Sequence, residues 1–254
     1  MSIFSKRQMP YVGPRFGHIE FEGRKIYLAG FTHGIGLIRP GKVPIDATKH
    51  LLETEKPHVL IEGKSVKFPA KILKNKELLT AEPVETELGK AVRDKQIRAS
   101  FKQTFGFDPY LRLKTVSLAA AVASPLLLFS KTLNRKRQEI FRGASANEIS
   151  EIGRRIHVDM RDIFRPGSDA SQDRKFWHLA ADFRSFLMAE AIIHRHKLLP
   201  KEKSIVLLSG IFHSKQVAAF LSDERLRRNY AEALPAPLVE IRRRVTEARL
   251  RETK

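Results

Sequence analysis

The stretch SIVLLSG at residues 204–210 is the segment that decides the fold class of this 254-residue chain. It is a short, almost entirely apolar run that ends in glycine, a pattern typical of a strand buried on both faces of a sheet. A similar run, PHVLIEG, occupies residues 57–63. Two such runs predict buried strands of the parallel kind, and therefore a protein of the α/β class.

The residues before the second run predict how the sheet begins. Residues 18–28 form two short strand-like segments around a Glu-Gly turn, which indicates a β-hairpin. Residues 45–56 have a helical pattern and lead into the strand at 57–63. Because strand, helix and strand follow one another, we expect the second hairpin strand and the strand at 57–63 to form a parallel pair with a right-handed crossover.

Helical patterns dominate the middle of the chain. They extend from about residue 90 to Phe164, and the sequence Arg-Pro-Gly at residues 165–167 ends them. A long helix is then expected from about residue 173 to 197. Its residues 176–193 are apolar on nearly every face, so it should be mostly buried.

The tail from Pro235 onward predicts one further helix. Its apolar stripe should dock on the protein's own core and consists of Leu238, Ile241, Val245 and Ala248. We therefore expect a single α/β domain over residues 1–254, with a mostly parallel central sheet flanked by helices. It would carry a helical insertion at about residues 90–167 and a basic C-terminal helix at about residues 235–254.

The composition restricts the chemistry and the partners. The chain has 47 Lys and Arg against 28 Asp and Glu, a net charge of +19, and no cysteine. The lack of cysteine excludes a disulfide scaffold, a cysteine nucleophile and a thiolate metal site, so any metal would need His, Asp or Glu. The positive charge favours nucleic acid, acidic lipid headgroups or a negatively charged substrate as partner, without choosing among them.

The expected location is the cytoplasm, with membrane association open. The N-terminal residues contain no apolar stretch of the length that a secretory signal needs. The longest uncharged run, residues 115–130, would span only about 24 Å as a helix, because each residue rises about 1.5 Å. Since the hydrocarbon core of a membrane is about 30 Å thick, we expect a buried or membrane-surface helix there before a membrane span.

Three strand-like segments each end near a residue that can do chemistry. His33 follows the first, Glu62 ends the second and His213 follows the third. The carboxyl ends of parallel strands meet at one edge of a sheet, where ligands bind, so these side chains should converge. Each histidine comes three residues after a glycine, Gly30 or Gly210, which lets the chain turn sharply off its strand.

Arg184 joins this set by a different argument. It lies inside the most apolar part of the long helix, where an unpaired guanidinium would cost several kcal/mol. It must therefore have a carboxylate partner, and Glu62, Asp182 and Glu190 are the candidates. His178 and Asp182, one turn apart on the same helix, can form a local pair.

These residues resemble the TraB family, which is grouped with PrgY, the Tiki proteases, the haem-binding ChaN proteins and erythromycin esterase. The family pattern is two Gly-x-x-His motifs with a glutamate and an arginine between them, and this chain has them in that order at His33, Glu62, Arg184 and His213. Residues 93–107 are also similar to an Arg-Asp helix of TraB-type members. The chain departs from the pattern after Arg184 and after His213. Ser185 stands where the family tends to have an acidic residue, and Ser214-Lys215 replaces a small residue and glycine.

The resemblance implies a fold like that of erythromycin esterase and ChaN, and hydrolysis of an amide or ester bond in a peptide or ester substrate, with a metal-dependent peptidase as the expected form and a metal-free, esterase-like form as its alternative. In a metal-dependent form, His33, His213 and Glu62 would hold Zn²⁺, Mn²⁺ or Co²⁺, which lowers the pKa of a bound water, and Arg184 would stabilise the oxyanion. In a metal-free form a histidine would take the proton from water directly, Glu62 would orient that histidine, and Arg184 would keep its role.

Two other classes of function stay open at this stage. One is a non-catalytic regulator that keeps the fold and binds a peptide, haem or an anionic membrane surface. The other is a nucleic-acid-binding module, which only the charge favours, because no zinc-finger spacing and no aromatic RNA-binding signature is present.

Overall fold

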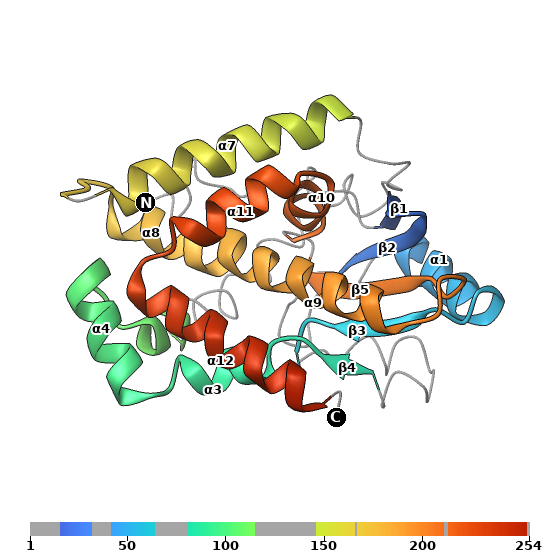
Figure 1. Ribbon diagram of the computed structural model, residues 1–254, viewed down its shortest axis with the longest axis horizontal. Helices are drawn as coiled ribbons and strands as arrows, with labels where there is room; N and C mark the ends of the chain where they lie inside the picture. Colours follow the sequence, from blue (N-terminus) through green and yellow to red (C-terminus); the bar gives the residue numbers. More distant parts are fainter. Residues whose placement is uncertain are drawn as a thin grey trace.

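The computed structural model describes residues 16–31, 42–63, 81–114, 146–165, 167–210 and 213–252. This part of the chain is an α/β fold with nine α-helices and a five-stranded mixed, mostly parallel sheet (Figure 1). The strands are β1 (Phe16–Phe21), β2 (Arg24–Phe31), β3 (His58–Ile61), β4 (Glu82–Pro83) and β5 (Ile205–Gly210). Their order across the sheet is β1-β2-β5-β3-β4, and only β1 is antiparallel to its neighbour.

The central strand is β5, the last strand in the sequence. All six of its residues are buried, and Ile205 is paired with Ile26 of β2 on one side and with His58 of β3 on the other. The expected direct pairing of β2 with β3 is therefore wrong, although the two strands run parallel to each other. An entirely buried strand needs hydrogen-bonding neighbours on both edges, and β5 meets this need by lying between them.

The hairpin of β1 and β2 forms as expected from the sequence. Glu22 and Gly23 connect the strands, and both have positive φ angles, of 48° and 76°. Two consecutive left-handed residues fit the twist of a tight hairpin, and glycine adopts this conformation without a steric cost.

Helices cover both faces of the sheet. Helix α1 (Lys42–Thr54) packs with Leu51 and Leu52 against Tyr27 and Val206, while Leu28 and Leu207 on the opposite face join the larger core. That larger core includes α9 (Arg184–Leu198) and α10 (Ser214–Ser222). The alternation of side chains along β2 and β5 thus separates two apolar layers, as expected for a sheet buried on both faces.

The remaining helices lie mainly on the α9 side of the molecule (Figure 1). They are α3 (Thr86–Ala91), α4 (Lys95–Phe105), α7 (Ala146–Phe164), α8 (Gln172–Trp177), α11 (Glu224–Glu232) and α12 (Ala236–Glu252). Helices α4 and α7 fall within the expected helical insertion, and residues 115–145 lie outside the described residues. The stripe of α12 docks on the core as expected, with Leu238, Ile241 and Val245 buried.

The expected long helix exists, but its middle is not α-helical. Helix α8 continues into a π-helical segment, η3 (His178–Phe183), and then into α9. π-Helical turns are rare and occur often at functional sites. Here the π-helical segment ends directly before Arg184, so it sets which way Arg184 and the residues after it face.

Arg24 of β2 closes the far end of α9. Its buried guanidinium donates hydrogen bonds to the carbonyl oxygens of His196, Leu199 and Lys203 at 2.9–3.1 Å. The last carbonyls of a helix lack partners within the helix, and a cation is favourable beside them. The hairpin thereby fixes the position of α9 relative to the sheet.

Candidate functional site

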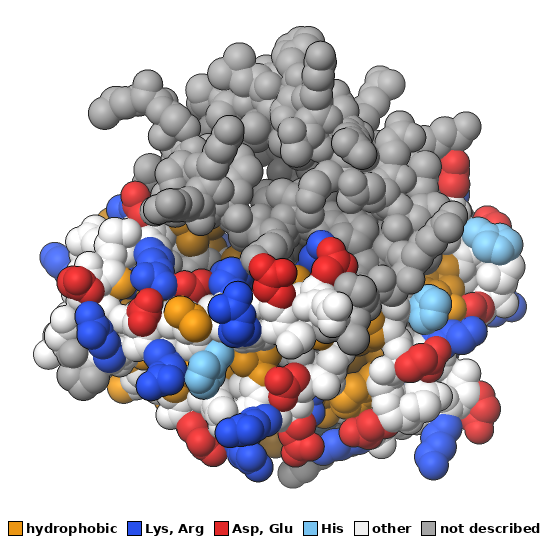
Figure 2. Space-filling model, turned by 90° about the horizontal axis from the view of Figure 1, so that it is seen from above, with side chains coloured by type: hydrophobic (Ala, Val, Ile, Leu, Met, Phe, Trp, Pro, Cys, Tyr) orange, Lys and Arg blue, Asp and Glu red, His pale blue; other side chains and the backbone are white. Residues whose placement is uncertain are grey.

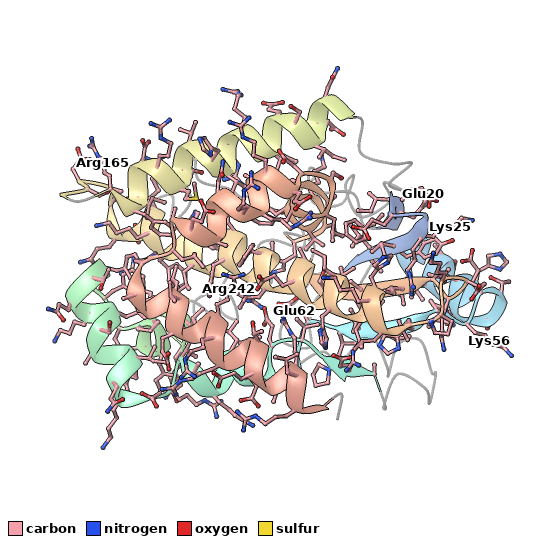
Figure 3. All side chains as sticks on the ribbon, in the orientation of Figure 1. Glu20, Lys25, Lys56, Glu62, Arg165 and Arg242 are labelled. Atoms are coloured by element: carbon pink, nitrogen blue, oxygen red, sulfur yellow. The ribbon has the colours of Figure 1, made fainter. Side chains whose placement is uncertain are left out.

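Glu62 follows β3 at the carboxyl edge of the sheet, next to α9 (Figure 3). Its backbone N–H donates to the carbonyl of Leu208, and its own carbonyl accepts from Glu85 N, both at 2.9 Å. Its carboxylate oxygen Oε2 accepts a hydrogen bond from Gly210 N, where β5 ends. Glu62 is therefore held by the ends of two neighbouring strands and is only 5% exposed.

Arg184 forms an ion pair with Glu62, which was one of its three candidate partners. Its Nε and Nη2 atoms also donate to the two carboxylate oxygens of Glu85, each at 2.7 Å, and Nη1 donates to the carbonyl of Ala180 at 3.4 Å. Asp182 and Glu190 pair with other arginines, Arg155 and Arg242.

We define the Arg184 cluster as Arg184, Glu62, Glu85 and His213. Its carboxylates act strongly on the Arg184 guanidinium. Burial alone would lower the pKa of the Arg184 guanidinium, but the carboxylates of Glu85 and Glu62 outweigh it and hold that pKa above its ordinary value. The guanidinium is thus always charged, and two carboxylates already occupy most of its N–H groups. The Arg184 side chain is 23% exposed and that of Glu85 13%, so this side of the cluster meets solvent.

His213 lies at the start of α10, at the same edge of the sheet. Its Nδ1 atom is 2.9 Å from Ser185 Oγ, and Ser185 Oγ donates its own proton to the carbonyl of Ala181 at 2.7 Å. Since the hydroxyl has only one proton to donate, we assign Nδ1 as the protonated nitrogen that donates to Ser185. In the neutral ring, Nε2 then carries the lone pair, 3.7 Å from Glu62 Oε1.

The structure therefore brings together three of the four residues expected at this edge: Glu62, Arg184 and His213. His33 lies outside the described residues. Strand β2 ends at Phe31, which is paired with Gly210 of β5, so the two strands that precede the Gly-x-x-His motifs end side by side.

Sequence analysis missed Glu85 and the role of Ser185. Glu85 follows β4, a strand of only two residues that has no recognisable pattern, and no sequence signal marks it. Ser185 was noted only as a departure from the family pattern. Its position directly after Arg184 suggested no contact with His213, because the π-helical turn that orients both residues was not expected.

The described residues do not by themselves form a metal site. Among them, no group of three or more His, Asp or Glu side chains is placed to hold a metal ion. Glu62 Oε1 contacts the Arg184 guanidinium and Oε2 accepts from Gly210 N. A divalent cation at Oε1 would lie beside a permanent positive charge, which opposes its binding.

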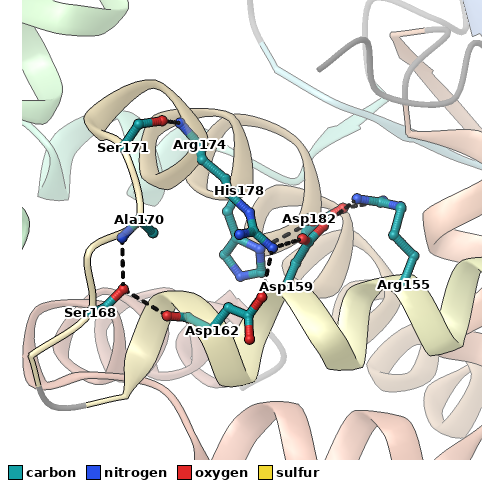
Figure 4. Close-up of polar contacts among 9 residues, drawn as sticks. All are labelled: Arg155, Asp159, Asp162, Ser168, Ala170, Ser171, Arg174, His178 and Asp182. Atoms are coloured by element: carbon teal, nitrogen blue, oxygen red, sulfur yellow. Dashed lines mark hydrogen bonds and ion pairs between the residues drawn. The ribbon is translucent and has the colours of Figure 1, made fainter. Parts of the chain in front are cut away.

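A second, mostly buried polar group, the Asp182 cluster, lies between η3, α7 and α11. Figure 4 shows its residues from η3 and α7. The cluster consists of Asp182, His178, Arg155 and Tyr230. Arg155 Nη2 contacts Asp182 at 3.0 Å, His178 Nδ1 is 3.2 Å from Asp182 Oδ2, and Tyr230 Oη is 2.9 Å from His178 Nε2. Burial would raise the pKa of Asp182, but His178 and Arg155 hold it below its ordinary value.

The charge excess is carried only in part by the described residues. They include 32 Lys and Arg and 26 Asp and Glu, so they account for +6 of the net charge of +19. Figure 2 shows acidic and basic side chains interspersed on the described part of one face. Among the described helices, none is both long and apolar enough to cross a membrane, and residues 115–130 lie outside them.

Comparisons of the chain with protein-family models, with curated proteins and with solved structures find no match. The resemblance to the TraB family therefore rests on the motif residues alone.

Proposed function

We propose that this protein is a hydrolase of amide or ester bonds, with His213, Glu62 and Arg184 as its reaction centre. The observation that carries the proposal is the placement of His213 Nε2 3.7 Å from Glu62 Oε1, at the carboxyl edge of a parallel sheet. This edge is where ligands bind in open α/β sheets. The resemblance to the TraB family points to the same chemistry.

The separation of the two atoms favours a bound water molecule between them. A distance of 3.7 Å is too long for a direct hydrogen bond, and one water can donate to both atoms. His213 Nε2 takes one proton from this water while the water oxygen forms a bond to the substrate carbonyl carbon, and the carbonyl π electrons move to oxygen. When the C=O bond re-forms, the bond to the leaving nitrogen or oxygen breaks, and this atom takes the proton back from His213.

The other residues position this pair. Glu62 orients the water and stabilises the imidazolium that forms, as a carboxylate next to a catalytic histidine does. Arg184 holds the Glu62 carboxylate in place through its ion pair, and Ser185 fixes the imidazole tautomer through Nδ1. Ser185 is fully buried and donates to Ala181, which favours a positioning role over that of a nucleophile.

The contact between Arg184 and Glu62 favours the metal-free form over the metal-dependent peptidase that the resemblance also allows. A Zn²⁺, Mn²⁺ or Co²⁺ ion held by His33, His213 and Glu62 would supply an activated water. Because the carboxylates of Glu62 and Glu85 already neutralise the Arg184 guanidinium, the proposed mechanism contains no step at a metal. Treatment with a chelator should therefore leave turnover unchanged, and its loss with recovery on adding Zn²⁺ or Mn²⁺ would instead support the metal-dependent form.

The experiment is turnover of a panel of peptide amides and carboxylic esters by wild type, Glu62→Gln and Glu82→Gln. Glu82 is a matched control, because it also lies at the β4 side of the sheet and pairs with an arginine, Arg195, but does not touch His213. We expect Glu62→Gln to lower turnover at least a hundredfold and Glu82→Gln to change it less than twofold. Equal activity in all three proteins would reject the proposed centre.

A second candidate is the non-catalytic binding or regulatory protein. The near-complete burial of Glu62 and His213 favours it, since a purely structural polar cluster would also be buried. Folded wild-type protein that turns over no member of the panel would support this function.

A further inference from the structure

The proposed hydrolysis leaves one requirement without an assigned group. Addition of water to a carbonyl carbon creates an oxyanion, which needs hydrogen-bond donors aimed at it. Arg184 was the expected donor, but Glu62, Glu85 and the carbonyl of Ala180 already engage four of its five N–H groups. We propose that the first turn of α10, with the side chains of Ser214 and Gln216, binds the carbonyl oxygen and the backbone of a peptide substrate. This inference rests on the proposed function and names its substrate class.

The first turn of α10 lies next to the proposed reaction centre. The helix has nine residues and starts at Ser214, directly after His213, which is its N-cap. No side chain caps this end, and the N-cap imidazole is instead bonded to Ser185. The N–H groups of a first helical turn lack partners within the helix and carry partial positive charge, so they attract anionic oxygen atoms.

A second, independent observation comes from two buried side chains in this turn. Ser214 is 1% exposed and Gln216 is fully buried, yet Ser214 Oγ and both polar atoms of the Gln216 amide have no hydrogen-bond partner. A buried polar group without a partner is destabilising and uncommon in folded proteins. Two of them in one turn beside His213 indicate that a bound molecule supplies the missing hydrogen bonds.

The two side chains are directed to the appropriate part of α10. The Cα–Cβ bonds of a helix tilt toward its N-terminus, so both side chains lean toward the end of α10 at which His213 lies. Because they are two residues apart, they point in different directions around the helix axis, on either side of His213. Gln216 is one turn before Phe220, which therefore shares its face of the helix, and the Phe220 ring packs on Phe186 of α9 at 5.4 Å. The imidazole of His213 is held by Ser185, which is also in α9. Gln216 thus lies on the side of α10 on which the imidazole is held.

The hydrogen-bonding groups fit a peptide better than an ester. The Ser214 hydroxyl, the Gln216 Nε2 and the helix N–H groups are donors for a carbonyl oxygen that becomes an oxyanion. Gln216 Oε1 is an acceptor and requires a donor, which the N–H of a scissile amide provides and the oxygen of a scissile ester does not. A site with a buried acceptor discriminates against a substrate that leaves it unpaired. We infer that the substrate is a peptide or a related amide.

The test compares Ser214→Ala and Gln216→Met with wild type on an N-acetyl dipeptide presented as its p-nitroanilide and as its p-nitrophenyl ester. Ser204→Ala is the matched control, because Ser204 is also buried with an unpartnered hydroxyl but lies at the opposite end of β5. We expect Ser214→Ala to lower kcat on both substrates at least tenfold with KM changed less than twofold. Gln216→Met should lower kcat/KM for the anilide at least tenfold more than for the ester, and Ser204→Ala should match wild type.

Two further measurements keep the result interpretable. Both variants remove unpaired polar groups, so their midpoints of thermal unfolding should equal or exceed that of wild type. Binding of N-acetyl-dialanine amide, measured by calorimetry, should weaken at least tenfold in Gln216→Met, and this readout does not depend on turnover.

The outcomes separate the two proposals. Wild type that binds the dialanine amide through Gln216 but hydrolyses nothing would reject the proposed function and keep the peptide site. If Ser214→Ala and Gln216→Met turn over and bind the substrates as wild type does, the peptide site is rejected and the hydrolase is kept. The polar groups of Ser214 and Gln216 would then contact only a buried water. Wild type that neither binds nor hydrolyses would reject both.

Discussion

Two ionic clusters meet the continuous helix formed by α8, η3 and α9 at positions only two residues apart, Asp182 and Arg184. Asp182, in the π-helical segment, faces Arg155 and His178 between helices, while Arg184 faces Glu62 and Glu85 at the ends of two strands. Both clusters contain carboxylate, guanidinium and imidazole groups, and each imidazole contacts a hydroxyl group, that of Tyr230 or that of Ser185. The clusters differ in what surrounds them, and this difference separates a structural role from a functional one.

The surroundings of the Asp182 cluster are entirely helical. Arg155 also pairs with Asp159, and Asp159 pairs with Arg174, so the cluster joins α7 to α8 and η3 (Figure 4). The Arg184 cluster instead lies beside strand ends and an uncapped helix N-terminus. We therefore assign stability to the first cluster and the proposed chemistry to the second.

The largest expected effect on stability is that of Asp182→Ala. Removing the carboxylate leaves His178 without its buried ion partner and Arg155 with Asp159, so we expect a loss near the lower end of the about 3–5 kcal/mol that breaking a buried ion pair typically costs. Unfolding in urea would measure the loss of free energy. Asp169→Ala is the control, since Asp169 also pairs with an arginine, Arg165, but is almost fully exposed and should change little. Equal free energies of unfolding of the two variants would contradict a structural role of the Asp182 cluster.

Acid should weaken the protein through the same residue. The pKa of Asp182 is lowered in the folded state by His178 and Arg155, which outweigh its burial. A lowered carboxyl pKa stabilises the fold above the unfolded value of about 3.9, and this contribution is lost as the pH falls through the folded value. The free energy of unfolding should thus decrease below about pH 5 in wild type and decrease less steeply in Asp182→Asn. Parallel curves for the two proteins would contradict this origin of the acid sensitivity.

Glu85→Gln should have a smaller effect, because Arg184 keeps its contact with Glu62. Hydrogen bonds to a charged group contribute about 1.5–3 kcal/mol, so the free energy of unfolding should fall by about this amount. Turnover should decrease less than in Glu62→Gln, since Glu62 Oε1 is the carboxylate oxygen that lies 3.7 Å from His213 Nε2. Glu87→Gln serves as the control, because Glu87 forms an ion pair with Lys90 at the surface. A loss of turnover as large as that of Glu62→Gln would show that the two carboxylates share one role.

Ser185→Ala should lower the free energy of unfolding by about 1–2 kcal/mol, since it removes the hydrogen bonds to His213 and to the carbonyl of Ala181. We expect about a tenfold loss of turnover, a part of the roughly 10²–10⁴-fold that a general base contributes, because Nδ1 of His213 loses its acceptor. The pH–rate profile distinguishes positioning from packing, since only a change at the imidazole shifts its acidic limb. An unshifted profile would assign Ser185 to packing alone.

The sequence predicted the elements of the fold better than their arrangement. The apolar runs at β3 and β5 and the hairpin were found because burial and turn chemistry are local properties. The position of β5 between β2 and β3 was not, since it depends on pairing between residues about 180 positions apart, such as Ile26 and Ile205. Strand β4 is too short to leave a pattern, and the π-helical segment has the same apolar composition as the α-helix around it.

Only part of the site was predicted, because some of its contacts also depend on residues that are distant in the sequence. Glu62, Arg184 and His213 were found from strand ends and from the need to pair a buried guanidinium, and they lie together. Glu85 has no such signal, because only the folded chain shows that its carboxylate reaches Arg184. The roles given to His33 and to residues 115–130 concern positions outside the described residues.

The late place of β5 in the sequence has a consequence for biosynthesis. While the nascent chain leaves the ribosome, β2 and β3 are complete long before residues 205–210 exist, and each lacks the neighbour that it has in the finished sheet. Open strand edges invite pairing with other chains, and parallel sheets built from distant segments close slowly. We therefore expect this protein to depend on chaperones during synthesis more than a protein whose sheet is completed in sequence order.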